Sequence, residues 1–266
     1  MKMALSLSLK TFDAEFVVND KCPVEIFNDQ WDGKMVDPRM KVGTWQGKTV
    51  MVKFDHPHSA AELEVYRKIG DHPNILPLLA VAENGKRMVY EYPSGGSLEN
   101  WMGKLKATEV QPLLLQTAKT LEFLHSKGFV HRNLKPSYIY FTQANHIKIG
   151  GLYCSAHPSP YYCSPRFAAP EQLTRFLDGV MSPATDVFTF AMCIPYFYGV
   201  KYWVNPMERN SFSSDDYARA QSPDSLTGTV PQHLIELMHR CLKLHPDQRC
   251  SLANVISTLE TNINTR

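Results

Sequence analysis

The sequence FLHSKGFVHRNLKP, residues 123–136, decides how the rest of the chain is interpreted. It overlaps the end of a segment, residues 110–125, whose apolar positions recur at the spacing of a helix with one buried face. Two short apolar stretches follow it at residues 138–141 and 146–149, and both are typical of strands. The quoted stretch therefore joins a helix to a small pair of strands through a polar loop.

Upstream of this stretch the pattern changes from helices to strands. The flexible connector SGGS at residues 94–97 separates the two kinds of sequence, and the chain is again mainly helical from residue 170 onward. The strand-rich part holds one helical segment at residues 59–69, and its strands are expected at residues 34–54 (around a turn at 45–48), 75–82 and 86–92. The sequence thus predicts two lobes with a cleft between them.

Composition narrows the classes of function. The 266 residues carry a net charge of +2 and no Lys/Arg-rich tract, which argues against nucleic acid or a membrane surface as the partner. An apolar run at residues 187–204 is interrupted by Pro195 and Lys201, so we expect a buried core helix and no membrane span. The six cysteines form no CxxC pair and no zinc-ligand spacing, which predicts reduced thiols in a cytoplasmic protein without a metal site.

Several segments, in order, resemble the protein kinase superfamily. The resemblance is carried by VMVK ending at Lys53, HPNIL at residues 72–76, EYPSGG at 91–96, HRNLKP at 131–136, AAPEQL at 168–173, ATDVFTFA at 184–191 and HRCLKLHPDQRCS at 239–251. It covers about residues 38–260. The segment VGTWQGKTVMVK, residues 42–53, and the C-terminal part lean toward the tyrosine-kinase-like group.

The resemblance implies an α+β fold, the bilobal kinase-like fold with a small antiparallel-sheet N-lobe and a mainly helical C-lobe. We divide the chain into an N-terminal extension with the start of the N-lobe (residues 1–37), the N-lobe (38–93) and the C-lobe (94–266), all within one kinase-like domain. Whether further domains flank it is left open.

The resemblance also implies a set of residues for nucleotide binding: Lys53, Glu62, Tyr90, Tyr92 and Lys135. Glu62 and Glu64 are both placed to pair with Lys53, and the sequence does not choose between them. Two features weaken this site. Only Gly33 and Gly43 stand where a glycine-rich phosphate loop is expected, with Asp32 and Asp37 nearby, and Pro93 offers no N–H where adenine would accept one.

Three positions depart from the catalytic residues of the family. Asn133 replaces the aspartate that handles the proton of the acceptor hydroxyl, and an amide cannot act as a base. Tyr138 replaces an asparagine that binds magnesium, for which a phenol is a poor ligand. Gly151 replaces the aspartate of the metal-binding DFG motif. We therefore expect no catalytic residue and no metal ligand among them.

Five other residues are expected to be structural. His131 and Arg132 fix the backbone of the loop, Asp186 begins the central buried helix, and Glu171 forms a buried ion pair with Arg249.

These observations predict a pseudokinase, which is a kinase-like scaffold or allosteric regulator that binds a signalling protein or a catalytic partner. They weigh against an enzyme, and they leave ATP without magnesium as the only cofactor to consider. The alternative is an atypical but active ATP-dependent protein phosphotransferase with a rearranged site, supported by the retained Lys53.

Overall fold

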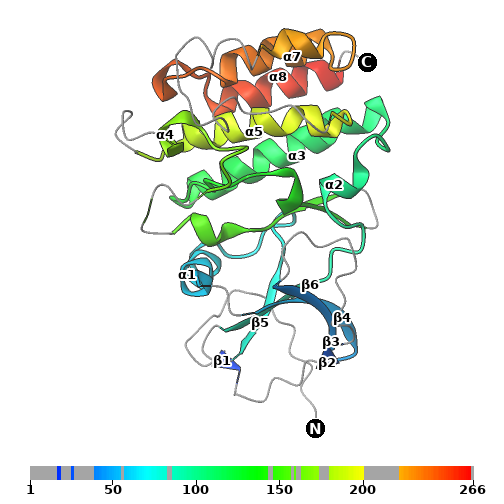
Figure 1. Cartoon of the computed structure of the whole chain (residues 1–266), viewed down its shortest axis with the longest axis vertical. Helices are drawn as coiled ribbons and strands as arrows, with labels where there is room; N and C mark the ends of the chain where they lie inside the picture. The colour runs from blue at the N-terminus through cyan, green and yellow to red at the C-terminus, as the bar shows by residue number, and fades with distance from the viewer. Residues whose placement is uncertain are drawn as a thin grey trace.

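The computed structural model of the chain describes ten stretches of backbone. They are residues 17–18, 25–26, 39–54, 57–82, 86–142, 146–156, 159, 163–173, 180–200 and 222–264. Figure 1 shows two lobes, a sheet with one helix at the bottom and a stack of helices above it. The two halves of the sequence with different periodicity are therefore separate layers in space.

The small lobe contains a twisted sheet. Its strands are β1 (Val17–Val18), β2 (Glu25–Ile26), β3 (Met40–Trp45), β4 (Lys48–Phe54), β5 (Leu78–Ala82) and β6 (Arg87–Glu91). They lie in the order β1-β5-β6-β4-β3-β2, and every pairing is antiparallel except that of β1 with β5. The hairpin between β3 and β4 turns at Gln46 and Gly47, both with positive φ, as the tight turns between antiparallel strands require.

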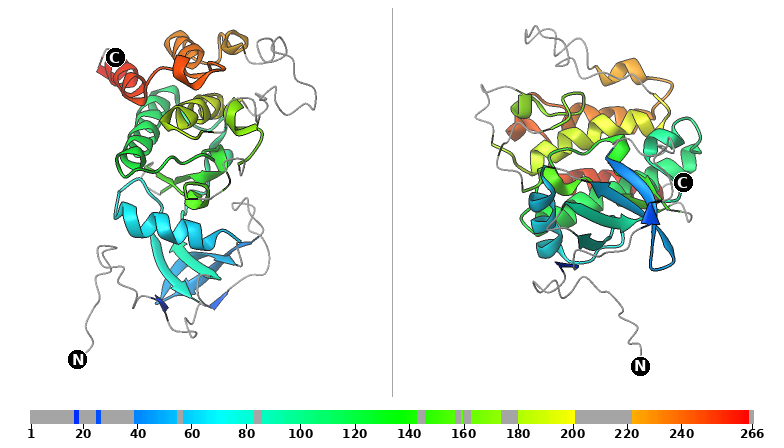
Figure 2. Two further views of the ribbon diagram at one scale, coloured as in Figure 1. Left: turned by 90° about the vertical axis from the view of Figure 1, so that its left-hand side faces the viewer. Right: turned by 60° about the horizontal axis from the view of Figure 1, so that its bottom comes forward.

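Helix α1 (Ser59–Ile69) lies across one face of this sheet, as Figure 2 shows. Its apolar residues Val65, Tyr66 and Ile69 are buried. Helix α1 also packs on the short 3-10 helix η5 (Leu152–Cys154), which belongs to the large lobe. Helix α1 therefore touches both lobes.

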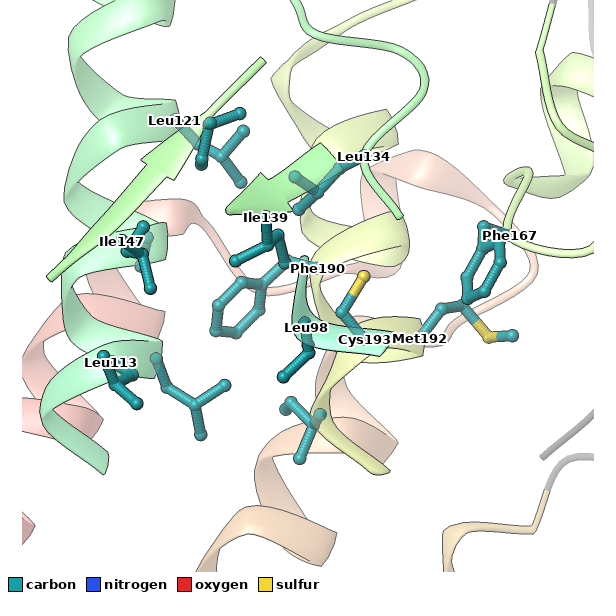
Figure 3. Close-up of a cluster of buried hydrophobic side chains, with 14 of the residues drawn as sticks. Leu98, Leu113, Leu121, Leu134, Ile139, Ile147, Phe167, Phe190, Met192 and Cys193 are labelled. Atoms are coloured by element: carbon teal, nitrogen blue, oxygen red, sulfur yellow. The ribbon is translucent and has the colours of Figure 1, made fainter. Parts of the chain in front are cut away.

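The large lobe is built from helices. They are α2 (Leu98–Trp101), α3 (Ala107–Ser126), α4 (Pro170–Leu173), α5 (Pro183–Phe197), α7 (Gln232–Cys241) and α8 (Leu252–Asn264), with 3-10 turns η4 (Pro136–Tyr138), η8 (Pro223–Leu226) and η9 (Pro246–Gln248). A small antiparallel pair, β7 (Ile139–Phe141) and β8 (Ile147–Ile149), lies on the side that faces the small lobe. Figure 3 shows apolar side chains of α2, α3, α5 and this strand pair converging on one core, including Leu98, Leu121, Ile139 and Phe190.

Main-chain hydrogen bonds attach two segments to the strand pair of the large lobe, one from the small lobe and one from the connector between the lobes. Leu76 N donates to Ile149 O at 2.9 Å, and Ile149 N donates to Asn74 O at 2.8 Å. Gly95 N donates to Phe141 O at 3.0 Å, and Phe141 N donates to Gly96 O at 2.8 Å. The segments on either side of β5 and β6 are thereby fixed to the strand pair of the large lobe.

The predicted α+β fold with a small antiparallel-sheet lobe and a helical lobe is confirmed. The apolar run beginning at Val187 lies in α5, where the side chains from Val187 to Phe197 are buried. Within the stretches described above, no helix has both the length and the apolar character needed to cross a membrane.

Candidate functional site

Lys53 and Glu62 form a buried ion pair between the sheet and α1. Lys53 lies on β4, paired with Met88 of β6 and Met40 of β3. Its Nζ donates to the Oε2 atom of Glu62, and both side chains are 1% exposed. Glu64 is on another side of α1, since positions two apart on a helix do not share a face, and it accepts a hydrogen bond from Lys68 at 2.7 Å. The geometry thus selects Glu62 as the partner of Lys53.

Aromatic side chains enclose this pair on the side of the sheet. Tyr66 donates from Oη to Leu76 O at 2.8 Å, and the ring of Tyr90 lies 6.1 Å from that of Tyr66. Burial, together with the negative charge of Glu62, raises the pKa of both phenols. Both are neutral at physiological pH, so neither adds charge beside the ion pair. Tyr92, also expected at the nucleotide site, is half-buried against the core.

Asp186 organises the loop that begins at His131. Its two carboxylate oxygens accept the backbone N–H groups of His131 at 2.7 Å and Arg132 at 2.8 Å, and a third contact of 2.8 Å joins it to Nε2 of His125. Arg132 has φ +67°, a conformation that is unfavourable for a residue with a Cβ. The bonds to Asp186 therefore hold the backbone in a shape that it would not keep alone.

His131 fixes the same loop from inside. Its Nδ1 accepts from Asn133 N at 3.2 Å, so the proton lies on Nε2, which donates to Gly150 O at 3.0 Å. Burial lowers the pKa of His131, which keeps the ring neutral. Gln172, which the sequence did not single out, donates to Arg132 O at 2.7 Å. The Arg132 guanidinium donates to Ser159 O.

Asn133 belongs to a hydrogen-bonded chain that includes a residue missed in the sequence. Its Nδ2 donates to the hydroxyl of Tyr153 at 2.9 Å, and its Oδ1 accepts from Ser164 N at 2.9 Å. The hydroxyl of Tyr153 also meets that of Tyr138 at 2.9 Å. The Tyr153 ring lies 5.0 Å from Lys53 Nζ, so one side chain spans the distance from the ion pair to Asn133. Its position directly after Gly151-Leu152 was the signal available for it.

Tyr138 and Gly151 fit each other sterically. Gly151 has φ +76°, and a Cβ placed on it would lie 2.5 Å from the Tyr138 ring. The ring therefore fills the space that a side chain at position 151 would need. Burial, and next the neighbouring Tyr153, raise the pKa of Tyr138, so its hydroxyl stays protonated.

Lys135 contributes a second cation to this region. Its Nζ donates to Ser164 Oγ at 3.0 Å and lies 4.5 Å from the centre of the Tyr138 ring. Ser164 is therefore held both by Lys135 and by Asn133.

The predicted pair of Glu171 with Arg249 is present in the large lobe. Arg249 donates through Nη1 and Nη2 to the two carboxylate oxygens of Glu171, each at 2.7 Å, and both side chains are fully buried. The same guanidinium also donates to the carbonyls of Ala184, Lys243 and Leu244. It fixes α4 to α5 and to the segment before η9.

The described residues do not fit a magnesium ion held by protein side chains, although the resemblance implies one. Gly151 has no side chain, and the Tyr138 hydroxyl is hydrogen-bonded to Tyr153. No group of three or more His, Cys, Asp or Glu within the described stretches could hold a metal. The expectations for Asp32, Gly33 and Asp37 concern residues outside the described part of the chain, and Gly43 lies within β3.

The comparisons with known proteins agree with one another. A family model described as "Protein kinase domain" matches residues 45–259. The chain is 26% identical over 256 residues to serine/threonine-protein kinase cds1 of Schizosaccharomyces pombe, covering 87% of this chain and 53% of that protein. It is 28% identical over 206 residues to probable serine/threonine-protein kinase MARK-A of Dictyostelium discoideum, covering 71% and 18% respectively.

A third relative is CBL-interacting protein kinase 1 of Oryza sativa, at 28% identity over 232 residues, covering 79% of this chain and 47% of that protein. The chain thus spans about half or less of the length of these relatives.

These relatives overturn the expectation of a pseudokinase with a degraded ATP site. They are named as protein kinases, two of them specifically as serine/threonine kinases, and none is named as an inactive scaffold. The inference of inactivity rested on residue identities: Asn133, Tyr138 and Gly151 at the catalytic positions, and the sparse glycines and Pro93 at the nucleotide site. The alternative made from the same sequence, an active phosphotransferase with a rearranged site, agrees better with the comparisons.

Proposed function

The chain belongs to the protein kinase domain family, and from this membership we propose that it is an ATP-dependent protein phosphotransferase with a rearranged site. The observation that carries the proposal is the buried pair of Lys53 and Glu62. The acceptor we propose is a serine or threonine hydroxyl of a protein, following the names of the relatives.

Lys53 is suited to bind a phosphate group. An ammonium carries three N–H donors, and among the described residues Glu62 is its one hydrogen-bond acceptor. The Glu62 carboxylate holds the ammonium in a fixed position before a ligand arrives, so little conformational entropy remains to be lost on binding. In a transfer reaction that depends mainly on positioning and charge, such a cation stabilises negative charge on phosphate oxygens.

Asn133 and Lys135 are the residues we propose for the acceptor side. The Asn133 amide can orient a hydroxyl by hydrogen bonding but cannot remove its proton. Lys135 places a second positive charge beside Ser164, at the edge of the segment that leads to α4.

The Tyr153 ring has to move before phosphates can reach Lys53. It lies 5.0 Å from the Lys53 ammonium and is 8% exposed, so it occupies the space beside that charge. We propose that nucleotide binding exchanges the aromatic ring for phosphate oxygens at Lys53.

The direct test is phosphoryl transfer from ATP to generic protein substrates, together with thermal-shift titrations of ATP with and without Mg²⁺. We expect transfer to fall about 10²-fold in Lys53→Met. Lys48→Met is the matched control, because Lys48 is an exposed lysine of the same strand. Lys53→Met alone leaves the Glu62 carboxylate buried and unpaired, which destabilises the fold. The double variant Lys53→Met with Glu62→Leu removes that carboxylate, so it separates the loss of the Lys53 charge from a folding defect.

Transfer that is equal in wild type and in Lys53→Met would contradict the proposal. So would the absence of any ATP-dependent shift in both metal conditions. The lean toward the tyrosine-kinase-like group and the cytoplasmic location stay predictions, which acceptor preference and fractionation of cells would test.

A further inference from the structure

Two thiols lie side by side at the far end of the large lobe. Cys241 is the last residue of α7, and Cys250 precedes α8. Their Sγ atoms are 3.5 Å apart. Cys250 N donates to Arg240 O at 3.1 Å, which ties the backbone of one cysteine to the residue beside the other. The contact is thus fixed by the backbone as well as by the side chains.

The two cysteines differ in exposure and in charge. Cys241 is fully buried, whereas Cys250 is half-buried and reachable from solvent. The hydrogen bond between the two thiols lowers the pKa of Cys250 to about 7, and the nearby Arg240 acts in the same direction. The same hydrogen bond, with burial, raises the pKa of Cys241.

The other described cysteines lack this arrangement. Burial raises the pKa of Cys154 to about 12 and that of Cys163 to about 11, and it also raises the pKa of Cys193. A thiolate is the reactive form of cysteine, so reactivity should concentrate at Cys250.

We propose that Cys241 and Cys250 are a dithiol that hydrogen peroxide converts reversibly into an intrachain disulfide. The Cys250 thiolate attacks one peroxide oxygen, the O–O bond breaks, and hydroxide leaves as water after protonation, giving a sulfenic acid on Cys250. The Cys241 sulfur then attacks the Cys250 sulfur, the S–O bond breaks, and a second water leaves. Two thiols and one peroxide yield one disulfide and two waters, and a thiol reductant reverses the change.

The geometry requires only a small movement. A disulfide has an S–S bond of about 2.05 Å, so the two sulfurs, 3.5 Å apart, must approach by about 1.5 Å. Cys250 follows directly after Arg249, which holds Glu171 in α4. Oxidation would therefore act on the residue next to the buried ion pair of the large lobe. The proposal does not depend on phosphotransfer activity.

The test treats the full chain with hydrogen peroxide, blocks remaining thiols with an alkylating agent, and maps disulfides by mass spectrometry of peptides. We expect a monomeric product that has lost two hydrogens, with a linked peptide pair containing Cys241 and Cys250, and recovery of both thiols with dithiothreitol. Cys250→Ser should abolish the linkage, Cys241→Ala should leave Cys250 as sulfenic or sulfinic acid, and Cys193→Ala should change nothing.

Alkylation rates of the untreated chain give a second measurement that needs no variant. Among the cysteines that the structure describes, we expect Cys250 to react first near pH 7, and its rate to rise with pH through the pKa of about 7 that the Cys241 hydrogen bond produces. Oxidation of Cys250 in wild type without linkage to Cys241 would overturn the proposal. A rate at Cys250 no faster than at Cys163 would also overturn it.

Discussion

Each lobe of the molecule contains a buried ion pair, and the two pairs differ in how completely they are satisfied. Arg249 makes two hydrogen bonds to Glu171 and three more to backbone carbonyls. Among the residues that the structure describes, Lys53 makes one hydrogen bond, to Glu62. Each cation also lies 5.0 Å from the centre of an aromatic ring, Phe188 for Arg249 and Tyr153 for Lys53.

The difference separates a structural pair from one that can take a ligand. The donors of Arg249 point at five acceptors within the fold, so no further anion can approach without breaking the packing. Within the described residues Lys53 has Glu62 as its one hydrogen-bond acceptor and lies over the Tyr153 ring, so we expect a phosphate oxygen to be a stronger partner than the ring. Burial alone does not distinguish the two pairs; the count of satisfied donors does.

The largest expected effect is at the pair in the large lobe. Arg249→Met leaves Glu171 as an unpaired buried charge and three carbonyls without their donor, so we expect a loss of ~3–5 kcal/mol or more in the free energy of unfolding. Urea denaturation measures it. Arg240→Met is the control, since Arg240 is exposed and donates to Thr258 at the surface, and should change stability by less than ~0.5 kcal/mol. Equal losses in the two variants would contradict the structural role.

The pair in the small lobe should respond differently to replacement of both partners. Lys53→Met alone should destabilise strongly, because Glu62 is left buried and unpaired. Adding Glu62→Leu should restore stability to within ~1 kcal/mol of wild type, since apolar side chains of similar size often replace a buried pair without loss. Arg249→Met with Glu171→Leu should not be rescued in this way, because the three carbonyls stay without donors. If the two double variants regained stability to a similar extent, the ion pairs of the two lobes would not differ in how completely they are satisfied.

Disturbing the steric fit between Gly151 and the Tyr138 ring should reduce the free energy of unfolding by an intermediate amount. Gly151→Ala must accept both a positive φ and a Cβ that overlaps the Tyr138 ring. Gly128→Ala is the matched control, with φ +79° and nothing within 4 Å of the added Cβ. We expect Gly151→Ala to cost ~1–3 kcal/mol more than Gly128→Ala, and Tyr138→Ala to reduce that difference. If the difference in stability between Gly151→Ala and Gly128→Ala persists in the Tyr138→Ala background, the Tyr138 ring is not its cause.

The smallest effect should come from the hydroxyl of Tyr153. Tyr153→Phe removes two hydrogen bonds, to Asn133 and Tyr138, and we expect a loss of ~1–2 kcal/mol in stability. Tyr153→Ala also removes the ring from the Lys53 ammonium, so the ATP concentration at half-maximal thermal shift should fall for Ala but not for Phe. An unchanged ATP midpoint in Tyr153→Ala would mean that the ring does not compete with nucleotide.

Contacts between residues of motifs that have a fixed place in the fold were predictable from the sequence. Contacts that depend on how a side chain is oriented were not. The pair of Glu171 and Arg249 followed from motif order, because each motif has a fixed place in the fold, whereas the hydrogen bonds from the His131 and Arg132 backbone to Asp186 came only from the structure. The choice of Glu62 over Glu64 needed the orientation of α1 against the sheet.

Two features of the site required the tertiary structure. Tyr153 meets Asn133 and Tyr138 only through folding of η5 against the loop, and no periodicity encodes such a contact. The prediction of inactivity took the losses at Asn133, Tyr138 and Gly151 together, and the protein kinase relatives overturned it. The steric fit of the Tyr138 ring to Gly151 is a separate feature, which appears only when the folded structure brings the two residues together.

The main-chain bonds between the lobes have a mechanical consequence. They lie at two points, one at Leu76 and Ile149 and the other at Gly95 and Phe141, and both points are on the strand pair β7 and β8. We infer that a rotation of the small lobe about the line through these points would keep both sets of hydrogen bonds. Because α1 also contacts η5, such a rotation would change the distance between Lys53 and the Tyr153 ring.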